Sequence, residues 1–372
     1  MTQQQGMPTA DAVDRGCRRI AQLVTRSLPL ADFFAEADRI LRTLVAYDAP
    51  CWMSCDPSTL LPTAHHAAGS DAVHLLDVAR DEFLEDDVNR FTDLARARLP
   101  AASLRQATGG QPRRSARFVR TVEPLGHGDG DELRAVFAVD GVVWGYVILH
   151  RISGAFTLDE VELVASLGPL FAEGIRRSIL VSSPLDDDAA PGLIVLSPGD
   201  RVEAITPPAR RWIAEMIDSG GRADDLPLAV LGLAARARHV AAGMSPVPAT
   251  ARLPLRGGGW VLAHAVMLED AGAEGRIGVT LSPAGRSELS AIVVEAYGLS
   301  PREREITRLV MTGLDTEQLA RRLSISPYTV QDHLKSVFRK IGVHSRRELV
   351  AEVFFRHAIS PPVDGRGATI SL

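Results

Sequence analysis

Residues 315–342 read DTEQLARRLSISPYTVQDHLKSVFRKIG, and this stretch decides how the C-terminal part of the chain folds. Asp315 and the glutamine three residues later form a capping box, which predicts the start of a short helix. Ser326 and the proline after it predict the start of a second helix, because serine caps helices and proline suits the first helical position. Gly342 supplies the left-handed residue that ends this helix. We therefore predict two helices joined by a three-residue turn at 324–326.

Two further capping boxes flank this helix pair. One spans Ser300–Glu303 and opens a helix that we expect to reach about Met311, with Gly313 as its left-handed end. The other spans Ser345–Glu348 and opens a fourth helix. Apolar residues recur at helical spacing within each helix, as expected where one side faces a core. The sequence thus predicts an all-α four-helix domain over 299–358.

The third helix separates apolar from polar side chains. At about 100° per residue, one arc is apolar and is predicted to face the core: Val330, Leu334, Val337, Phe338 and Ile341. The opposite arc carries aromatic, amide, acidic, hydroxyl and basic groups: Tyr328, Gln331, Asp332, Lys335, Ser336 and Arg339. Such groups contact base edges and phosphates when the second helix of a helix-turn-helix lies in the major groove. For any single residue, a solvated helix face is the alternative interpretation.

Charge is distributed unevenly along the 372-residue chain. The whole chain has a formal net charge of −5, but residues 300–357 contain eleven basic and seven acidic residues, a net charge of +4. The remainder therefore carries −9, and both lysines of the chain, Lys335 and Lys340, fall in the basic segment. A basic end on an acidic body is typical of a nucleic-acid-binding module joined to a separate regulatory part.

The C-terminal segment closely resembles the LuxR-type DNA-binding domain. The resemblance is confined to 299–358 and rests on these matches: Leu299–Ile306, Gly313, Leu319–Leu323, Ile325–Pro327, Thr329–Val330, His333, Lys340, Gly342–Val343 and Ser345–Arg346. It implies that the third helix lies in the major groove, with base contacts from Gln331, Asp332 and Lys335. It also implies phosphate contacts from Thr329, Ser336, Arg339, Lys340 and Arg346. Because the fourth helix commonly pairs two subunits in this family, it implies a homodimer on a two-fold site.

Asp332 departs from the family pattern, in which a neutral or basic side chain is frequent at this position. Its carboxylate either accepts a hydrogen bond from a cytosine amino group or is repelled by phosphate. Both interpretations stay open at the level of the sequence.

The N-terminal part predicts an α+β domain. After a polar tail at 1–12, helical spacing over Val13–Ser27 and Leu30–Ala46 precedes a strand at Cys51–Ser54. Four further elements are expected: a helix over Glu82–Ala97, strands over Leu133–Val139 and Val142–His150 joined by a hairpin turn at Asp140–Gly141, and a long helix over Leu158–Leu180 that begins with a capping box at Thr157–Glu160. This order of helices, strands and a long helix over 13–181 resembles a GAF sensor domain.

An acidic, proline-flanked linker is predicted at 182–191. Residues 192–285 then resemble a PAS domain, with two strands, a short helix and three later strands: Gly192–Leu196, Arg201–Ile205, Pro208–Ile217, Ala251–Leu255, Trp260–Leu268 and Arg276–Leu281. A connecting helix over 286–298 leads to the DNA-binding domain, and a tail follows at 359–372. The predicted fold class is multidomain α+β: a GAF-like and PAS-like αβ sensor region followed by an all-α four-helix helix-turn-helix domain.

Three other classes of protein compete with this interpretation. A sigma-factor region has its own helix-turn-helix but usually lacks the fourth helix. A phosphorelay receiver needs an early acidic pair and an aspartate ending a central strand, and the first half offers neither in order. An enzyme would draw on His65–His66, Cys51 or the acids Glu85–Asp87, but the chain has no P-loop, His-Glu-x-x-His or Gly-x-Ser-x-Gly motif. We therefore expect no catalysis, no cofactor and no metal site.

The cysteines and the hydropathy pattern predict a cytoplasmic protein. Cys17, Cys51 and Cys55 make no disulfide framework. The last two lie at the ends of the extended segment Cys51–Cys55, roughly 13 Å apart. This distance exceeds the reach of a disulfide, so buried thiols are expected. No apolar run approaches the length of about 18 residues that a membrane span needs, and the N-terminal residues lack the pattern of a signal peptide.

The combined prediction is a LuxR-type, sequence-specific transcription regulator with a sensing N-terminal half. The expected partners are double-stranded DNA, a second copy of the chain, RNA polymerase in the case of an activator, and an unidentified small-molecule effector, with no membrane. A signal would change the spacing of two recognition helices through the helix Glu288–Tyr297. The effector, the operator sequence and the direction of regulation stay open.

Overall fold

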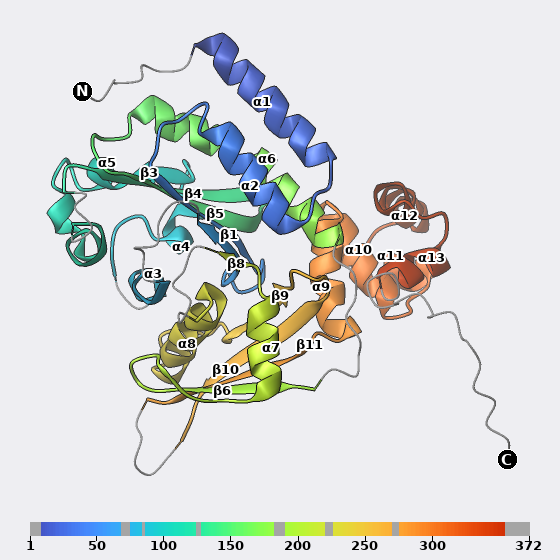
Figure 1. The fold of residues 1–372 in the computed structure, drawn as a ribbon. Coiled ribbons are helices and arrows are strands. Elements are labelled where there is room, and N and C mark those ends of the chain that lie inside the picture. Colours follow the sequence, from blue (N-terminus) through green and yellow to red (C-terminus); the bar gives the residue numbers. More distant parts are fainter. Residues whose placement is uncertain are drawn as a thin grey trace, which may run out of the picture. The chain divides into compact units, whose positions relative to one another are not determined.

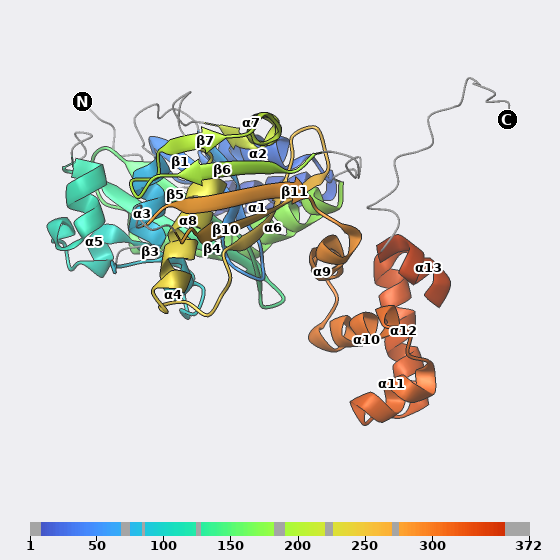
Figure 2. The same cartoon turned by 90° about the horizontal axis from the view of Figure 1, so that it is seen from below.

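The computed structural model describes residues 9–67, 75–83, 86–123, 128–181, 190–219, 226–269 and 275–353. The chain divides into two compact units (Figures 1 and 2). The αβ unit comprises Met1–Ser182 and Ala190–Ala284, and the helical unit continues from Gly285. Most of the predicted linker 182–191 and the tail 359–372 lie outside the described residues, so these boundaries stay predictions.

The αβ unit begins with a six-stranded sheet in the order β3-β4-β5-β1-β2-β8. Its strands are β1 (Ala49–Cys55), β2 (Pro62–Ala67), β3 (Ala101–Ser103), β4 (Asp131–Val139), β5 (Val142–Arg151) and β8 (Asp218–Ser219). All neighbours pair antiparallel except β2 and β8, which pair parallel. The short β8 comes from the segment after the predicted linker, so this segment contributes an edge to the first sheet.

Helices cover both faces of the first sheet (Figure 1). On one side lie α1 (Ala10–Thr25), α2 (Leu30–Leu41) and α6 (Leu158–Val181), where the Trp52 ring lies 5.0 Å from the Phe171 ring and 5.6 Å from the Phe137 ring. The other side carries shorter helices: α3 (Leu75–Phe83), α4 (Phe91–Leu94), α5 (Leu104–Ala107), the 3₁₀ turn Pro112–Arg114 and a π-helical turn Phe118–Val122. The order of helices, strands and a long helix on which the GAF resemblance rests is therefore present.

Two local predictions in this region are confirmed and one is wrong. The β4–β5 turn has positive φ at Asp140 (53°) and Gly141 (75°), as a tight hairpin requires. The amide of Glu160 donates to the Thr157 hydroxyl at 3.2 Å, which completes the capping box before α6. The single helix predicted over 82–97 does not form. Asn89 has a φ of +59°, which no helix tolerates, and this residue separates α3 from α4.

The second sheet has five antiparallel strands in the order β7-β6-β11-β10-β9. Figure 2 labels β7, β6, β11 and β10. Its elements are β6 (Gly192–Leu196), β7 (Val202–Ile205), α7 (Pro207–Glu215), α8 (Leu228–Ala241), β9 (Thr250–Pro254), β10 (Trp260–Met267) and β11 (Ile277–Pro283). When strands are counted from the start of each sheet, both sheets share the order 2-1-5-4-3 along their five main strands. The strands agree with the prediction, but the sequence interpretation missed α8.

Helix α8 joins the two sheets into one unit. It packs against α3 and β2 on one side and against β10 and β11 on the other, and its residues 228–237 are all buried. A second link is the ion pair between Asp56, which is buried, and Arg252, at 2.7 Å. The backbone amide of Arg252 also donates to the Asp56 carboxylate at 3.0 Å. The two αβ segments therefore share an interior.

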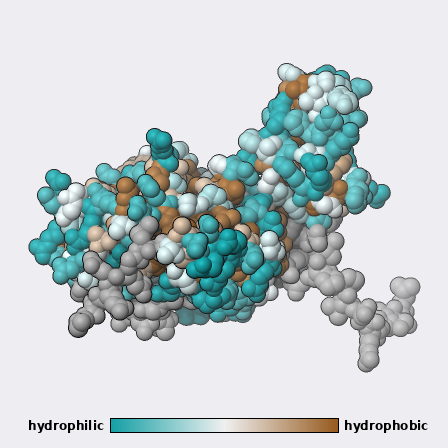
Figure 3. All heavy atoms as spheres, turned by 90° about the horizontal axis from the view of Figure 1, so that it is seen from above, coloured by the Kyte–Doolittle hydropathy of each residue, from teal (hydrophilic) through white to brown (hydrophobic). Residues whose placement is uncertain are grey.

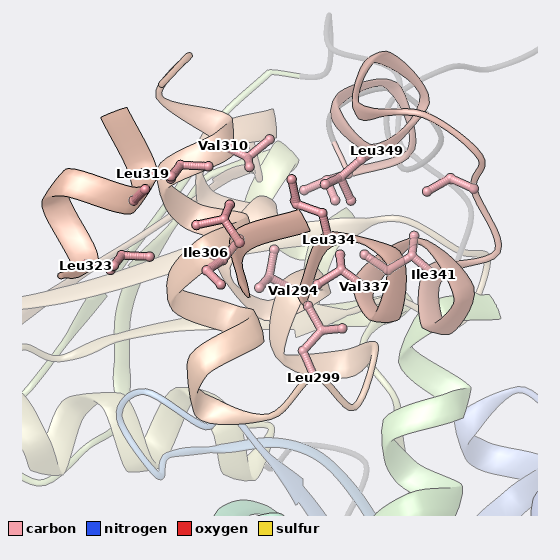
Figure 4. Close-up of a cluster of buried hydrophobic side chains, with 14 residues drawn as sticks. Val294, Leu299, Ile306, Val310, Leu319, Leu323, Leu334, Val337, Ile341 and Leu349 are labelled. Carbon is pink, nitrogen blue, oxygen red and sulfur yellow. The ribbon is translucent and has the colours of Figure 1, made fainter. Parts of the chain in front are cut away.

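The helical unit consists of a connecting helix and four helices around one apolar core. Its elements are α9 (Arg286–Ala296), α10 (Pro301–Met311), α11 (Thr316–Leu323), α12 (Pro327–Ile341) and α13 (Arg346–Ala351). Figure 4 shows side chains from all five helices converging on the centre of the unit. The predicted core residues of α12 are buried, except Phe338, which is partly exposed. The multidomain α+β fold class is confirmed.

The surface is mostly hydrophilic on the face that Figure 3 shows, and hydrophobic residues form small groups there. Such scattered apolar residues are normal for a water-exposed surface. In the described parts of the chain, no helix combines the length and the apolar character that crossing a bilayer requires.

Candidate nucleic-acid interface

The turn between α11 and α12 has the geometry of a helix-turn-helix. Ser324 ends α11 in the left-handed conformation, with a φ of +53°. Two residues later, Ser326 caps α12, and its hydroxyl accepts a hydrogen bond from the Thr329 amide at 3.1 Å. Gly342 ends α12 with a φ of +80°. Each of these boundaries lies at the residue that the sequence predicted.

Helix α12 buries one side and exposes the other. Val330, Leu334, Val337 and Ile341 are buried in the core of the helical unit. Figure 4 labels the last three of them. The opposite side, here called the polar face of α12, contains six of the predicted DNA-binding residues: Tyr328, Gln331, Asp332, Lys335, Ser336 and Arg339. Tyr328 is the most exposed large hydrophobic residue of the described chain, at 72%. The predicted separation into two arcs is therefore present.

Neighbouring side chains on the polar face contact one another. The Lys335 ammonium lies 3.4 Å from an Asp332 carboxylate oxygen, and the Arg339 guanidinium donates to the Ser336 hydroxyl at 3.4 Å. Thr329 is half-buried at the edge of this face, with its hydroxyl 2.8 Å from that of Ser326. These contacts are long or exposed, so water competes for the same groups and the contacts add little to stability.

Lys340, a predicted phosphate contact, takes part in an ion pair within the helical unit. Its ammonium lies 2.6 Å from a carboxylate oxygen of Glu303, whose side chain is only 7% exposed. The same oxygen accepts the Ser300 amide at 2.7 Å and so closes the capping box of α10. Burial alone would raise the pKa of Glu303, but hydrogen bonds from Lys340, Ser336 and the Ser300 amide lower it to about 2. Glu303 thus holds the start of α10 against the end of α12.

Arg346, the other basic residue predicted near phosphate, is half-buried at the start of α13. One guanidinium nitrogen, Nη2, is buried and has no hydrogen-bond partner among the described residues. Desolvation lowers the pKa of Arg346, and the nearby carboxylate of Asp315 opposes that shift. Arg346 thus lies at the first position of α13, as the capping residue Ser345 predicts, but its side chain is less accessible than the polar face of α12.

Sequence reasoning missed the second role of Glu303. The capping box was visible because its two residues lie three positions apart, whereas Lys340 lies 37 residues away. It also missed the ion pair of 3.2 Å between Arg304 of α10 and Glu295 of α9, which ties the connecting helix to the domain.

The αβ unit contains a small cavity between its first sheet and the helices α3, α4 and α8. The cavity has a volume of about 10 Å³, and its lining is mainly apolar: Met53, Leu60, Pro62, Val78, Glu82, Phe91, Thr92, Tyr146 and Leu228. This volume holds about one water molecule. Leu228 belongs to α8, so the second αβ segment closes a cavity of the first.

A buried ionic network borders this cavity. Arg134 lies 2.6 Å from Glu82 and 2.7 Å from Glu132, and Arg117 lies 2.9 Å from Glu132. All four side chains are at most 5% exposed. Burial raises the pKa of Glu82, whereas Arg117 and Arg134 outweigh burial at Glu132 and lower its pKa to about 2.

The residues considered for catalysis do not assemble into a cluster. His65 is buried on β2, and the next residue, His66, faces the other way and stacks on Phe34 with ring centres 6.5 Å apart. Cys51 and Cys55 are buried free thiols, as expected. Of the predicted acids, Asp87 accepts hydrogen bonds from Ser115 and Arg117, and Glu85 lies outside the described residues. Within the described ranges, no group of three or more His, Cys, Asp or Glu residues is placed to hold a metal ion.

Comparisons with known proteins match the helical unit. The family described as bacterial regulatory proteins, luxR family, matches residues 298–353. A putative HTH-type transcriptional regulator of Mycobacterium bovis is 50% identical over 54 residues, which cover 14% of this chain and 6% of that protein. The nitrate/nitrite response regulator protein NarL of Escherichia coli is 44% identical over 50 residues, 13% of this chain and 23% of NarL. The chain thus spans only a small part of the curated relatives it matches.

Among solved structures, the GAF domain of a phosphoenolpyruvate-protein phosphotransferase from Coxiella burnetii is 15% identical, with a TM-score of 0.30. That similarity covers 45% of this chain and 95% of the GAF domain. The match of the helical unit is specific, and it coincides with the four helices and the turn described above. Residues 298–353 of this chain form a helix-turn-helix domain of the luxR family of bacterial regulatory proteins.

Proposed function

We propose that this chain regulates transcription by binding specific duplex DNA through α12. One observation supports the proposal: the polar face of α12 is exposed on the side of the helix opposite the buried apolar core of the domain. A helix held in this way can enter the major groove without disturbing its own packing. The basic charge of the segment supports binding, because phosphate contacts supply most of the sequence-independent affinity.

The predicted DNA-binding residues fall into two groups. Gln331, Asp332 and Lys335 are exposed in the middle of the polar face and are proposed to contact base edges. A second group is proposed to contact phosphates and to orient the domain on the duplex: Tyr328, Thr329, Ser336, Arg339, Lys340 and Arg346. In this group, Lys340 and Arg346 also pack within the domain, so their loss is expected to affect folding as well as binding.

The proposal includes a two-fold complex and a cytoplasmic site of action. A homodimer would place two α12 helices in successive major grooves, as two-fold operators require. An activator of this kind would also contact RNA polymerase. We propose regulation rather than catalysis, because the matching family consists of regulatory proteins.

Genome-wide mapping of bound sites with the full chain tests the proposal, followed by mobility-shift titrations of the enriched duplexes. We expect enrichment of one two-fold motif. Its affinity should fall linearly with salt on logarithmic axes, because phosphate contacts release counterions. A folded chain that shows no sequence-selective binding to any enriched duplex at low ionic strength contradicts the proposal.

We further propose that the cavity of the αβ unit is where a small, mainly apolar effector acts. The cavity of about 10 Å³ is too small for such a molecule as it stands, so binding would have to separate α3, α4 and α8 from the sheet. A thermal-shift screen with small apolar compounds tests this, with Val78→Ile as the variant that fills the space by one methylene group. Compounds that stabilise the wild type and the filled variant equally bind elsewhere.

A further inference from the structure

Asp332 and Lys335 form a donor–acceptor pair on the polar face of α12. The Lys335 ammonium lies 3.4 Å from an Asp332 carboxylate oxygen, and the Lys335 and Asp332 side chains are 71% and 49% exposed. They are three positions apart, so they lie one above the other on the same side of the helix. Asp332 is the single acid among the residues predicted to contact DNA.

Folding does not explain this pair. An ion pair between two exposed side chains contributes little to stability, since both charges are already well solvated. An acid that faces DNA also weakens binding unless it finds a donor, because every phosphate carries negative charge. The major groove offers such a donor in the amino group of cytosine.

The spacing of the pair matches the exposed edge of one base pair. In a G·C pair, guanine O6 and the cytosine N4 amino group both face the major groove and hydrogen-bond to each other. They are therefore about 3 Å apart, the length of an N–H···O bond. Lys335 supplies a donor and Asp332 an acceptor at nearly this separation.

Building on the proposed DNA binding, we propose that Asp332 and Lys335 recognise one G·C base pair together. The Lys335 ammonium donates to O6 and N7 of guanine, and the Asp332 carboxylate accepts from N4 of the paired cytosine. Because both side chains leave the helix in fixed order, the pair distinguishes G·C from C·G. In the reversed base pair, the carboxylate would face O6 and the ammonium would face an amino group.

The same geometry disfavours the other two base pairs. A T·A pair presents an acceptor and a donor in the favourable order, but it places the thymine methyl group near the position of guanine N7. Lys335 then loses its second acceptor. An A·T pair presents the donor and the acceptor in the unfavourable order. Each half-site should therefore contain one strongly selected guanine on a defined strand.

A charge exchange tests this inference. Random duplexes are selected with the full-length wild type and with the double variant Asp332→Lys, Lys335→Asp. We expect the selected guanine to become cytosine on the same strand while the rest of the motif is unchanged. We also expect the affinity of the variant for the wild-type duplex to fall by at least about tenfold, the usual effect of a mismatched base pair.

The matched control exchanges another exposed ion pair of the same domain. Glu317 and Arg321 lie 3.8 Å apart on α11, and their side chains are 78% and 70% exposed. The double variant Glu317→Arg, Arg321→Glu keeps the net charge, and it should select the wild-type motif. A change of motif in this control would show that charge exchange alone alters selection, and it would overturn the inference.

The outcomes separate the inference from the proposed function. A wild type that selects no motif contradicts DNA recognition itself. A wild type that selects a motif that the Asp332 and Lys335 exchange leaves unchanged overturns only the paired recognition. Asp332→Asn is the second variant, because asparagine prefers adenine and should convert the selected G·C to T·A. A folded Asp332→Asn variant that keeps G·C, or selects nothing, also overturns the inference.

Discussion

The αβ unit and the helical unit place their charges in opposite ways. The αβ unit buries Arg117, Arg134, Glu82 and Glu132 within its interior, where they neutralise one another. The core of the helical unit is apolar, and Glu303 is the one charged residue classed as buried among the described residues of this unit. A buried charge is expensive to unpair, whereas an exposed charge is free to bind. Charges therefore support the fold of the αβ unit, and in the helical unit most of them remain available to a ligand.

The largest expected effect comes from unpairing the buried network. Arg134→Met leaves Glu82 and Glu132 without their shared partner and should cost the αβ unit about 3–5 kcal/mol. All four tryptophans lie in the αβ unit, so urea unfolding followed by tryptophan fluorescence reports this unit alone. Arg39→Met, which breaks an exposed ion pair with Glu36, is the control and should leave stability nearly unchanged, because both charges are well solvated. Equal losses of stability in the two variants would contradict the expected difference between buried and exposed ion pairs.

A core substitution in the helical unit should act on stability there and leave the tryptophan signal unchanged. Leu334→Ala removes a buried side chain of α12 and should cost about 2–5 kcal/mol. The measurement is thermal unfolding by far-ultraviolet circular dichroism beside tryptophan fluorescence on the same sample. The helical transition should move to lower temperature, and the fluorescence midpoint should stay in place. A shift of both would show that the two units unfold together.

The two lysines of the helical unit allow an exposed charge to be compared with one that pairs with a buried acid. Lys335→Ala should weaken specific DNA binding by about 1–3 kcal/mol and leave stability nearly unchanged, because the side chain is exposed. Lys340→Met should lower stability, since it leaves the nearly buried Glu303 without its cation. Titrations of an enriched duplex and denaturant melts separate the two effects. If Lys335→Ala lowers stability as much as Lys340→Met, the assignment of Lys335 to binding and of Lys340 to folding is wrong.

The smallest expected effect is a pH dependence carried by Glu303. Its pKa is about 2 in the folded domain against an ordinary value of 4.5, so its contribution is complete above pH 4.5 and is lost as the pH falls towards 2. Between pH 4.5 and 3.5 the loss should be roughly 1 kcal/mol, because one pKa unit corresponds to about 1.4 kcal/mol. Thermal melts of wild type and Glu303→Gln across this range measure it. A variant with the same pH slope as the wild type would assign the dependence to other carboxyls.

The helical unit was predictable nearly to the residue because its boundaries are encoded locally. Ser300, Asp315 and Ser345 each cap a helix through residues three positions away. Such local patterns can be recognised without knowledge of the fold. The pairing of Glu303 with Lys340 depends on how α10 packs on α12, so no local sequence pattern predicts it. The proposed DNA contacts were predictable as a face of α12, whereas the pairing of Asp332 with Lys335 needed the side-chain positions.

The αβ unit was predictable in outline only. Helix α8 is apolar around its whole circumference over 228–235, so it lacks the one-sided pattern by which helices are recognised. Its burial from two sides explains that composition. The helix predicted over 82–97 is the opposite error, because helical spacing of apolar residues predicted a helix that does not form. Phe91 and Leu94 recur at helical spacing and are indeed buried, but the left-handed Asn89 interrupts the backbone before them.

Helix α8 packs against both sheets, and this has a practical and an evolutionary consequence. A fragment that stops at residue 181 would leave Met53 and Val78 without the leucines of α8 that cover them, and it should aggregate on expression. A fragment of residues 9–284 keeps this contact intact and is the natural choice for isolated study. For the same reason, recombination could exchange the helical unit between proteins more easily than it could exchange either sheet.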